Sequence, residues 1–217
     1  MLPIGDDNSS RRSVPVVTFI LIVVNVLVFL VELNSGNAFI ERWTVVPRRL
    51  LANPASDFLT IFTAMFMHGG WLHLLGNMLY LWIFGDNVED SFGPNGFLIF
   101  YLLCGIGATL AQVAADPRSN IPNLGASGAI AGVLASYLVM FPNRRVRVLL
   151  GYIVIPMPAL IVIGFWFLLQ LINGAGSIAG AGQSDGVAYM AHIGGFISGL
   201  LLTSVFRGSG RSQYRFR

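Results

Sequence analysis

Long apolar runs separated by short polar connections dominate this sequence. About 20 consecutive apolar residues are needed to cross the hydrocarbon core of a bilayer as a helix, and six runs are close to that length. The predicted helices cover residues 15–33, 71–89, 96–115, 124–141, 147–171 and 187–206. The pattern therefore predicts an all-α membrane protein whose single domain is a bundle of six transmembrane helices.

The segments around these helices complete the predicted domain organisation. The longest connection, residues 34–70, is too polar to cross a membrane and too apolar to be a free loop. Such a segment is typical of chain that lies in the membrane interface, although an ordinary folded loop is the alternative. Residues 1–14 and 207–217 are predicted to be terminal tails on either side of a membrane domain at 15–206.

Composition supports a membrane location and limits the partners. Of the 217 residues, 55% are hydrophobic and only 11% are charged, whereas soluble domains usually carry about 25% charged residues. The basic residues form no stripe, so nucleic acid is excluded as the expected partner. Membrane lipid is the partner that this composition favours. The single cysteine, Cys104, can form no internal disulfide.

The arginines predict an orientation. An even number of spans places both termini on one side of the membrane. Nine arginines would then lie on the side of the termini: Arg11, Arg12, Arg144, Arg145, Arg147, Arg207, Arg211, Arg215 and Arg217. Four would lie on the other side: Arg42, Arg48, Arg49 and Arg118. Because cytoplasmic segments are enriched in basic residues, both termini are predicted to be cytoplasmic. The short N-terminal tail without a presequence favours a bacterial-type plasma (inner) membrane.

The chain has three histidines, and all of them lie near the start of a predicted helix. His68 and His73 accompany the second helix and His192 the sixth, while Ser127 lies near the start of the fourth. These three helices run in the same direction. At 1.5 Å per residue, His73, Ser127 and His192 lie roughly 3–8 Å below the starts of their helices. Ionisable residues are rare in bilayers, so a polar site opening to the non-cytoplasmic side is predicted.

The motif around Ser127 has two interpretations. In Gly125-Ala126-Ser127-Gly128 it stands at a helix start, where unpaired N–H groups and the helix dipole favour developing negative charge. A hydroxyl there can attack a carbonyl while its own amide helps to hold the oxyanion. The alternative is that the motif only packs helices. Small residues that allow close packing recur on the fourth and sixth helices: Gly128, Gly132, Ala191, Gly195 and Gly199.

His192 also has more than one possible role. If the fourth and sixth helices pack through their small residues, His192 reaches Ser127 and serves as its general base. The second to sixth spans carry no acid except at their cytoplasmic or loop ends, so a Ser-His dyad is possible and a Ser-His-Asp triad is not. The alternatives are a metal ligand, a proton relay or an interhelical hydrogen bond. Since no Cys, Asp or Glu near the histidines completes a usual ligand set, neither a metal nor another cofactor is expected.

His73 and Asn77 form a second polar pair. They are four residues apart and therefore share one face of the second predicted helix. Both side chains can donate hydrogen bonds. Facing Ser127, they would act as side-chain donors to an oxyanion. A purely structural hydrogen bond that holds the second helix in the bundle is an equally good reading.

Taken in order, these motifs resemble the rhomboid intramembrane serine proteases. The second helix reads His68-Gly-Gly-Trp-Leu-His73-Leu-Leu-Gly-Asn77, with Gly85 and Glu89 further along. The motifs around Ser127 and His192 follow, and the likeness covers residues 61–200. It implies a Ser127–His192 catalytic dyad and an oxyanion hole made by Asn77, His73 and the Ser127 amide. It also implies substrates that are membrane proteins, cut in or near a transmembrane segment at small residues.

The chain departs from the pattern of some rhomboids in two places. A Trp-Arg pair of the first loop is reversed here as Arg42-Trp43, and a tyrosine that stacks on the catalytic histidine is replaced by Ala131. Tyr189 is a hypothetical substitute for orienting His192. Asn173 to Gly186 is rich in glycine and predicts either a lid over the site or a plain connector.

Three functions remain on sequence grounds. The first is an intramembrane protease, and the second is a rhomboid-like pseudoenzyme that binds membrane clients. The third is a transporter or channel. Intact Ser127 and His192 argue against the pseudoenzyme. A proton-coupled transporter is expected to hold a carboxylate at mid-depth, and the later spans have none.

Overall fold

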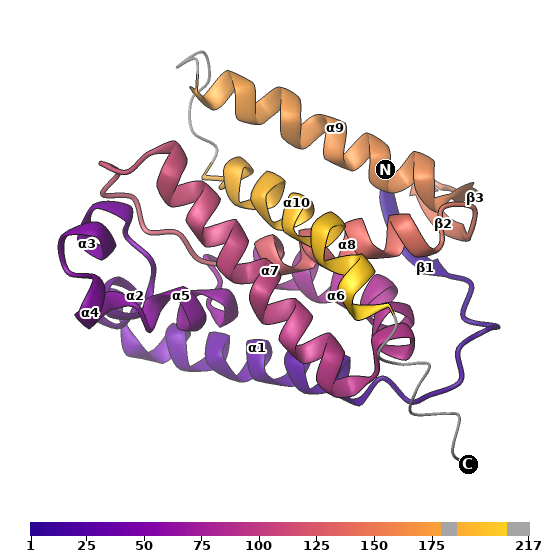
Figure 1. The fold of residues 1–217 in the computed structure, drawn as a ribbon, viewed down its shortest axis with the longest axis horizontal. Helices are drawn as coiled ribbons and strands as arrows, with labels where there is room; N and C mark the ends of the chain where they lie inside the picture. Colours follow the sequence, from indigo (N-terminus) through magenta and orange to yellow (C-terminus); the bar gives the residue numbers. More distant parts are fainter. Residues whose placement is uncertain (179–185, 208–217) are drawn as a thin grey trace.

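The computed structural model describes residues 1–178 and 186–207, and most of them are helical (Figure 1). The long helices are α1 (Val16–Ser35), α6 (Trp71–Phe92), α7 (Pro94–Ala115), α8 (Ser127–Met140), α9 (Ala159–Ile178) and α10 (Tyr189–Phe206). The short helical segments are α2 (Asn37–Trp43), α3 (Pro47–Ala52), α4 (Pro54–Asp57), α5 (Thr60–Thr63) and the 3-10 turn η1 (Ala64–Phe66). The strands are β1 (Leu2–Asp6), β2 (Arg145–Leu150) and β3 (Ile153–Pro158).

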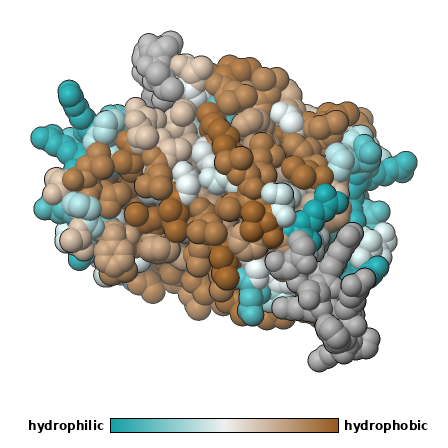
Figure 2. All heavy atoms as spheres, in the orientation of Figure 1, coloured by the Kyte–Doolittle hydropathy of each residue, from teal (hydrophilic) through white to brown (hydrophobic). Residues whose placement is uncertain are grey.

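Several helices are suited to a lipid environment. Within the described residues, α1, α7, α9 and α10 are long and apolar enough to cross a membrane. The segment 54–66 together with α6 would make a fifth span, bent by 78° at the break between them. Figure 2 shows hydrophobic atoms across the middle of the molecule and hydrophilic atoms at its two ends, the surface expected of a protein embedded in lipid.

Helix α8 lies at the centre of the bundle. All ten residues from Gly128 to Tyr137 are buried, because the helix is apolar all round and other helices cover it on every side. It has 14 residues, fewer than the 18 predicted, and it begins at Ser127. At 1.5 Å per residue it is only about 21 Å long. Because α8 is shorter than the helices that surround it, its start at Ser127 lies inside the molecule.

The prediction of an all-α fold is wrong, because the structure contains three strands. The predicted helix at 147–171 is wrong in its first part, where β2 and β3 lie. Strands β1, β2 and β3 form an antiparallel sheet with β2 in the middle. The exposed Arg145 and Arg147 alternate with the buried Val146 and Val148, which is the two-residue period of a strand. Prolines at 156 and 158 cannot stand inside a helix. The helix α9 therefore begins only at Ala159.

The connection between α1 and α6 is compactly folded. Its short helices are tied together by Arg49, whose side chain donates to the carboxylate of Asp57 and to the carbonyl oxygens of Glu41 and Thr44. Further along, the buried carboxylate of Glu32 in α1 accepts the N–H of His68. These bonds fix the chain that leads into α6.

The predicted glycine-rich lid is only partly within the described residues. Its first part, up to Ile178, continues helix α9. Residues 179–185 lie outside the described residues. Of the segment that follows, Gly186, Val187 and Ala188 line the cavity described below.

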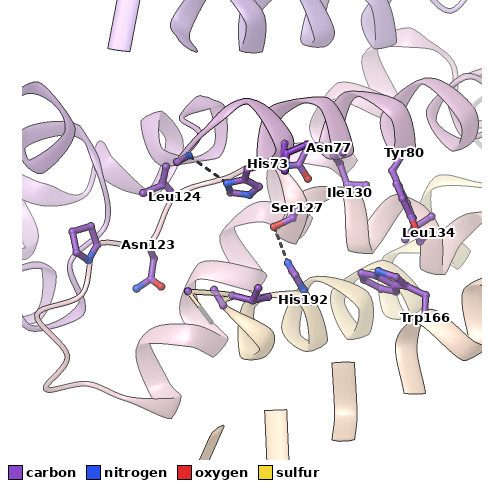
Figure 3. A pocket seen from close by; sticks show the side chains of 17 residues that line it. His73, Asn77, Tyr80, Asn123, Leu124, Ser127, Ile130, Leu134, Trp166 and His192 are labelled. Carbon is purple, nitrogen blue, oxygen red and sulfur yellow. Dashed lines mark hydrogen bonds between the residues drawn. The ribbon is translucent and has the colours of Figure 1, made fainter. Parts of the chain in front are cut away.

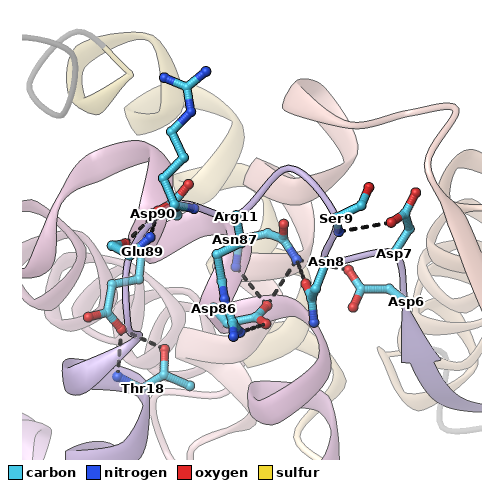
Figure 4. A network of polar contacts seen from close by, with 12 residues as sticks. Asp6, Asp7, Asn8, Ser9, Arg11, Thr18, Asp86, Asn87, Glu89 and Asp90 are labelled. Atoms are coloured by element: carbon cyan, nitrogen blue, oxygen red, sulfur yellow. Dashed lines mark hydrogen bonds and ion pairs between the residues drawn. The ribbon is translucent and has the colours of Figure 1, made fainter. Parts of the chain in front are cut away.

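Polar contacts attach the N-terminal segment to the end of the bundle that carries the sheet (Figure 4). The carboxylate of Glu89 in α6 accepts the N–H groups of Val17 and Thr18 at 2.9 and 2.7 Å. It thereby satisfies unpaired donors at the start of α1. Asp6 of β1 accepts bonds from the Tyr137 hydroxyl at 2.6 Å and from the Asn87 amide at 2.9 Å. Strand β1 is therefore attached to both α6 and α8.

Asp6 predicts a pH-dependent stability. Burial raises the pKa of Asp6 from 3.8 to about 6, and the hydrogen bond from Tyr137 partly opposes this rise. Between these values the folded protein binds a proton that the unfolded chain releases, so this stabilising contribution is lost as the pH rises. The difference in melting temperature, wild type minus Asp6→Asn, should therefore decrease as the pH is raised from 4.5 to 7. Thermal unfolding in detergent measures both melting temperatures.

The exposed neighbour Asp7 supplies the control. Bonds from Ser9 lower the pKa of Asp7, so Asp7 is ionised in both states above about pH 5. The melting-temperature difference between the wild type and Asp7→Asn should stay constant over the same range. A difference for Asp6→Asn that does not change with pH would contradict the argument.

Candidate active site

Helices α8 and α10 approach each other closely through small residues. A Cβ atom added to Gly195 would collide with the carbonyl oxygen of Gly128, and one added to Gly199 with that of Gly132. Glycine at these positions lets the two backbones touch. The N–H of Ala191, at the start of α10, donates to the Gln112 side chain from α7 at 3.1 Å.

This contact brings the candidate nucleophile and base together. The Nε2 atom of His192 lies 2.8 Å from the Oγ atom of Ser127, within hydrogen-bonding distance (Figure 3). Ser127 is the first residue of α8, and His192 lies in the first turn of α10. Both side chains are half-buried. The arrangement can transfer the hydroxyl proton to the imidazole ring as the oxygen attacks a carbonyl.

His73 and Asn77, which belong to α6, lie on the side of Ser127 that is opposite to His192 (Figure 3). The Nδ1 atom of His73 accepts the N–H of Gly69 at 3.3 Å, which leaves Nε2 to carry the proton of the neutral ring. Asn77 is buried, and its Nδ2 has no hydrogen-bond partner among the described residues. Both side chains carry hydrogen-bond donors and line the same cavity as Ser127.

Gly125 keeps the space between these groups open. A Cβ atom at this position would lie 2.8 Å from the Nε2 atom of His73 and 3.6 Å from the Oγ atom of Ser127. Its φ angle of +129° is also one that only glycine adopts readily. A side chain here would fill the place where a substrate carbonyl oxygen would lie.

A cavity of about 600 Å³ connects these residues. Ser127 and His192 line it together with His73, Asn77 and Trp166 (Figure 3). The volume is within the usual range for small ligand sites and can hold several residues of an extended peptide. Ser127, His192, His73 and Asn77 therefore form a polar cluster in the wall of a mostly apolar cavity.

The sequence analysis missed Gln170, a residue of α9. Its Oε1 atom lies 2.8 Å from the Nδ1 atom of His192. The ring of Trp166 lies 5.7 Å from the His192 ring, centroid to centroid, and Tyr189 approaches it edge-on at 6.5 Å. The signal was present in the sequence, because none of the first eleven residues of α9 has a charged or amide side chain and Gln170 follows them directly.

His68 lies outside the contact between Ser127 and His192. Its ring is buried and packs edge-on against His73 at 5.1 Å. Neither ring nitrogen has a hydrogen-bond partner within the described part of the chain. Across residues 1–178 and 186–207, no three His, Cys, Asp or Glu side chains are grouped to hold a metal ion.

Comparison of the amino-acid sequence with known proteins shows which family the chain is similar to. A family model described as the Rhomboid domain matches residues 55–209. The rhomboid protease GluP of Bacillus subtilis is 32% identical over 171 residues, which are 76% of this chain and 33% of GluP. The mitochondrial Rhomboid protein 1 of Saccharomyces cerevisiae is 30% identical over 191 residues, 84% of this chain and 51% of that protein.

The extent of these matches differs between relatives. The chain spans about a third to a half of the length of GluP and of the yeast protein. YdcA of Bacillus subtilis is 30% identical over 195 residues, which are 88% of both chains. The family model thus covers helices α6 to α10 and every candidate site residue.

Proposed function

The chain belongs to the rhomboid family, which confirms the resemblance seen in the sequence, and we propose that it is an intramembrane serine endopeptidase. Its substrates are other membrane proteins, cut in or near a transmembrane segment. The observation that carries the proposal is the 2.8 Å hydrogen bond between Ser127 and His192 at the wall of the cavity. Relatives named as rhomboid proteases support the same reaction class.

In the proposed reaction, Ser127 is the nucleophile and His192 is the general base and acid. The Oγ atom attacks the substrate carbonyl carbon while its proton moves to Nε2 of His192. The C–N bond then breaks, and the imidazolium gives its proton to the leaving amine. Water next attacks the acyl-enzyme, losing a proton to His192. That proton returns to Ser127 as the acid product leaves, so no external reactant besides water is needed.

Asn77, His73 and the backbone amide of Ser127 form the proposed oxyanion hole. The side chains of Asn77 and His73 line the same cavity as Ser127, which begins α8. Backbone N–H groups in the first turn of a helix have no partner within the helix. These donors are in place before the negative charge develops, which is what lowers the barrier.

The membrane arrangement that the sequence predicts remains a proposal. We propose that six helices cross the bilayer within residues 15–206 and that the connection 34–70 lies at the interface. Both termini are then cytoplasmic, and the cavity opens to the non-cytoplasmic side of the plasma membrane. The exposed apolar side chains and the two hydrophilic ends of the molecule support this placement (Figure 2). The opening admits the water that the second step of the reaction consumes.

A reconstitution experiment tests the proposed function. The purified protein would be placed in liposomes with single-span substrates whose outer ends contain small residues. Two fragments whose new termini map to that end of the span are expected. If a broad panel of such substrates stayed intact, the chain would instead be a binder of membrane clients, and the protease proposal would be wrong.

Removing one oxyanion donor should weaken the reaction without abolishing it. Asn77→Ala and His73→Ala are each expected to lower kcat by about 10- to 100-fold, somewhat less than the loss typical of a principal oxyanion donor, because two other donors remain. KM should change little, since these bonds form mainly in the transition state. Steady-state kinetics on the reconstituted proteins measure both values. Wild-type kcat in both variants would exclude this role.

A further inference from the structure

The polar side chain of Gln170 lies in an apolar environment and makes contact with the candidate base. Gln170 is buried, and its neighbours along α9 are mostly large apolar residues. A buried amide costs free energy unless its donors and acceptor find partners. The described structure provides two such partners: the Trp166 carbonyl oxygen and the His192 ring.

The first partner fixes how the amide is turned. The Nε2 of Gln170 donates to the carbonyl oxygen of Trp166 one helical turn earlier, at 3.2 Å. Turning the amide over would place two oxygen atoms together at that distance with no proton between them. The Oε1 atom therefore faces the His192 ring. An oxygen at 2.8 Å from Nδ1 requires that Nδ1 carry the proton.

From this geometry we propose that Gln170 is the positioning residue that sets the tautomer and the ring orientation of His192. With the proton held on Nδ1, Nε2 is free to accept the proton of Ser127. The neutral amide does this without burying a charge, so the site needs no carboxylate. The inference rests on the proposed function and goes beyond it, because it assigns the third member of the hydrogen-bonded chain Ser127–His192–Gln170.

The contribution of Gln170 should appear in kcat and not in substrate binding. Gln170 does not line the cavity. Gln170→Met keeps the length of the side chain but removes the acceptor. We expect kcat to fall by about 10- to 100-fold, part of the gain that a well-placed general base supplies, with KM changed less than about threefold. Gln170→Glu keeps both contacts while its buried carboxyl group is protonated, because one oxygen accepts from Nδ1 and the hydroxyl donates to the Trp166 carbonyl oxygen. This variant should recover about tenfold of the loss.

Leu171→Met provides the matched control. It introduces the same side chain at the adjacent position of α9, where Leu171 is exposed. This variant should keep the wild-type kcat and melting temperature. Loss of activity in both methionine variants would indicate a general disturbance of α9 and would overturn the positioning role.

Nitrogen NMR tests the tautomer directly and does not depend on cleavage. The chain has three histidines, so ¹⁵N-histidine labelling gives few signals, and those of His192 are assigned with His192→Ala. The wild type should show a proton on Nδ1 of His192 and none on Nε2, and Gln170→Met should show a mixture. A wild-type ring protonated on Nε2 would overturn the inference even if Gln170→Met failed to fold. An unchanged tautomer in a folded Gln170→Met would also overturn it. A failure of the proposed function would instead show as intact substrate in the reconstitution experiment.

Discussion

Replacing Ser127 by alanine is expected to lower the rate of substrate cleavage by about 10⁴- to 10⁶-fold, the loss seen when a serine nucleophile is removed from a hydrolase. The reason is that no other hydroxyl lies within hydrogen-bonding distance of His192 among the described residues. Substrate binding should be preserved, because alanine leaves the cavity walls in place. Fragment formation over time in reconstituted liposomes measures the rate, and co-purification of the intact substrate measures binding.

Ser136→Ala provides the matched control for this variant. Ser136 is buried in the same helix, and its hydroxyl oxygen lies 3.0 Å from the hydroxyl oxygen of Thr203. The single hydroxyl proton of Thr203 can be donated to the carbonyl oxygen of Gly199 at 2.6 Å, so Ser136→Ala leaves Thr203 with a partner. This control should fold and cleave like the wild type. Residual cleavage above about 1% of wild type in Ser127→Ala would assign the nucleophile to another residue.

Replacing His192 by alanine should have an effect of similar size. Without the imidazole, the Ser127 hydroxyl has no base and the leaving amine has no acid, so both chemical steps slow down. We expect a loss of about 10⁴-fold or more in kcat. The change removes the bonds to Ser127 and Gln170 and leaves the close contact of Gly195 with Gly128 intact. The variant should therefore keep the fold, with a melting temperature lowered by the loss of a partner for the buried Gln170 amide.

The double variant distinguishes a shared mechanism from two separate effects. Residues that act as a unit are not additive, so Ser127→Ala/His192→Ala should be no slower than the slower single variant. A further loss of several orders of magnitude in the double variant would indicate that the two residues act independently. That result would argue against the dyad.

Much of the helical framework could be predicted from the sequence. The predicted helix at 96–115 corresponds to α7 at Pro94–Ala115, and the one at 187–206 to α10 at Tyr189–Phe206. Length and apolar composition decide these elements because lipid leaves the backbone few alternatives to a helix. The juxtaposition of Ser127 and His192 could be anticipated for a related reason, since small residues at helical spacing mark the faces that pack closely.

The missed features depend on partners that are distant in sequence. Strand β1 exists because it pairs with β2, about 140 residues away along the chain, and nothing in residues 2–6 alone shows that partner. Gln170 is 22 residues before His192, and its value as an acceptor depends on how α9 packs against α10. Local pattern identifies a polar residue in an apolar run, but the identity of its partner comes from tertiary structure.

The central claim is that the Ser127 hydroxyl is activated by the His192 ring, and covalent labelling tests it most directly. The detergent-purified protein would be treated with a fluorophosphonate, which reacts with activated serine hydroxyls, and the adduct located by peptide mass spectrometry. The account predicts one adduct, on Ser127, formed at least about 100-fold more slowly in His192→Ala. An adduct on another serine, or equal labelling of Ser127 in His192→Ala, would contradict it.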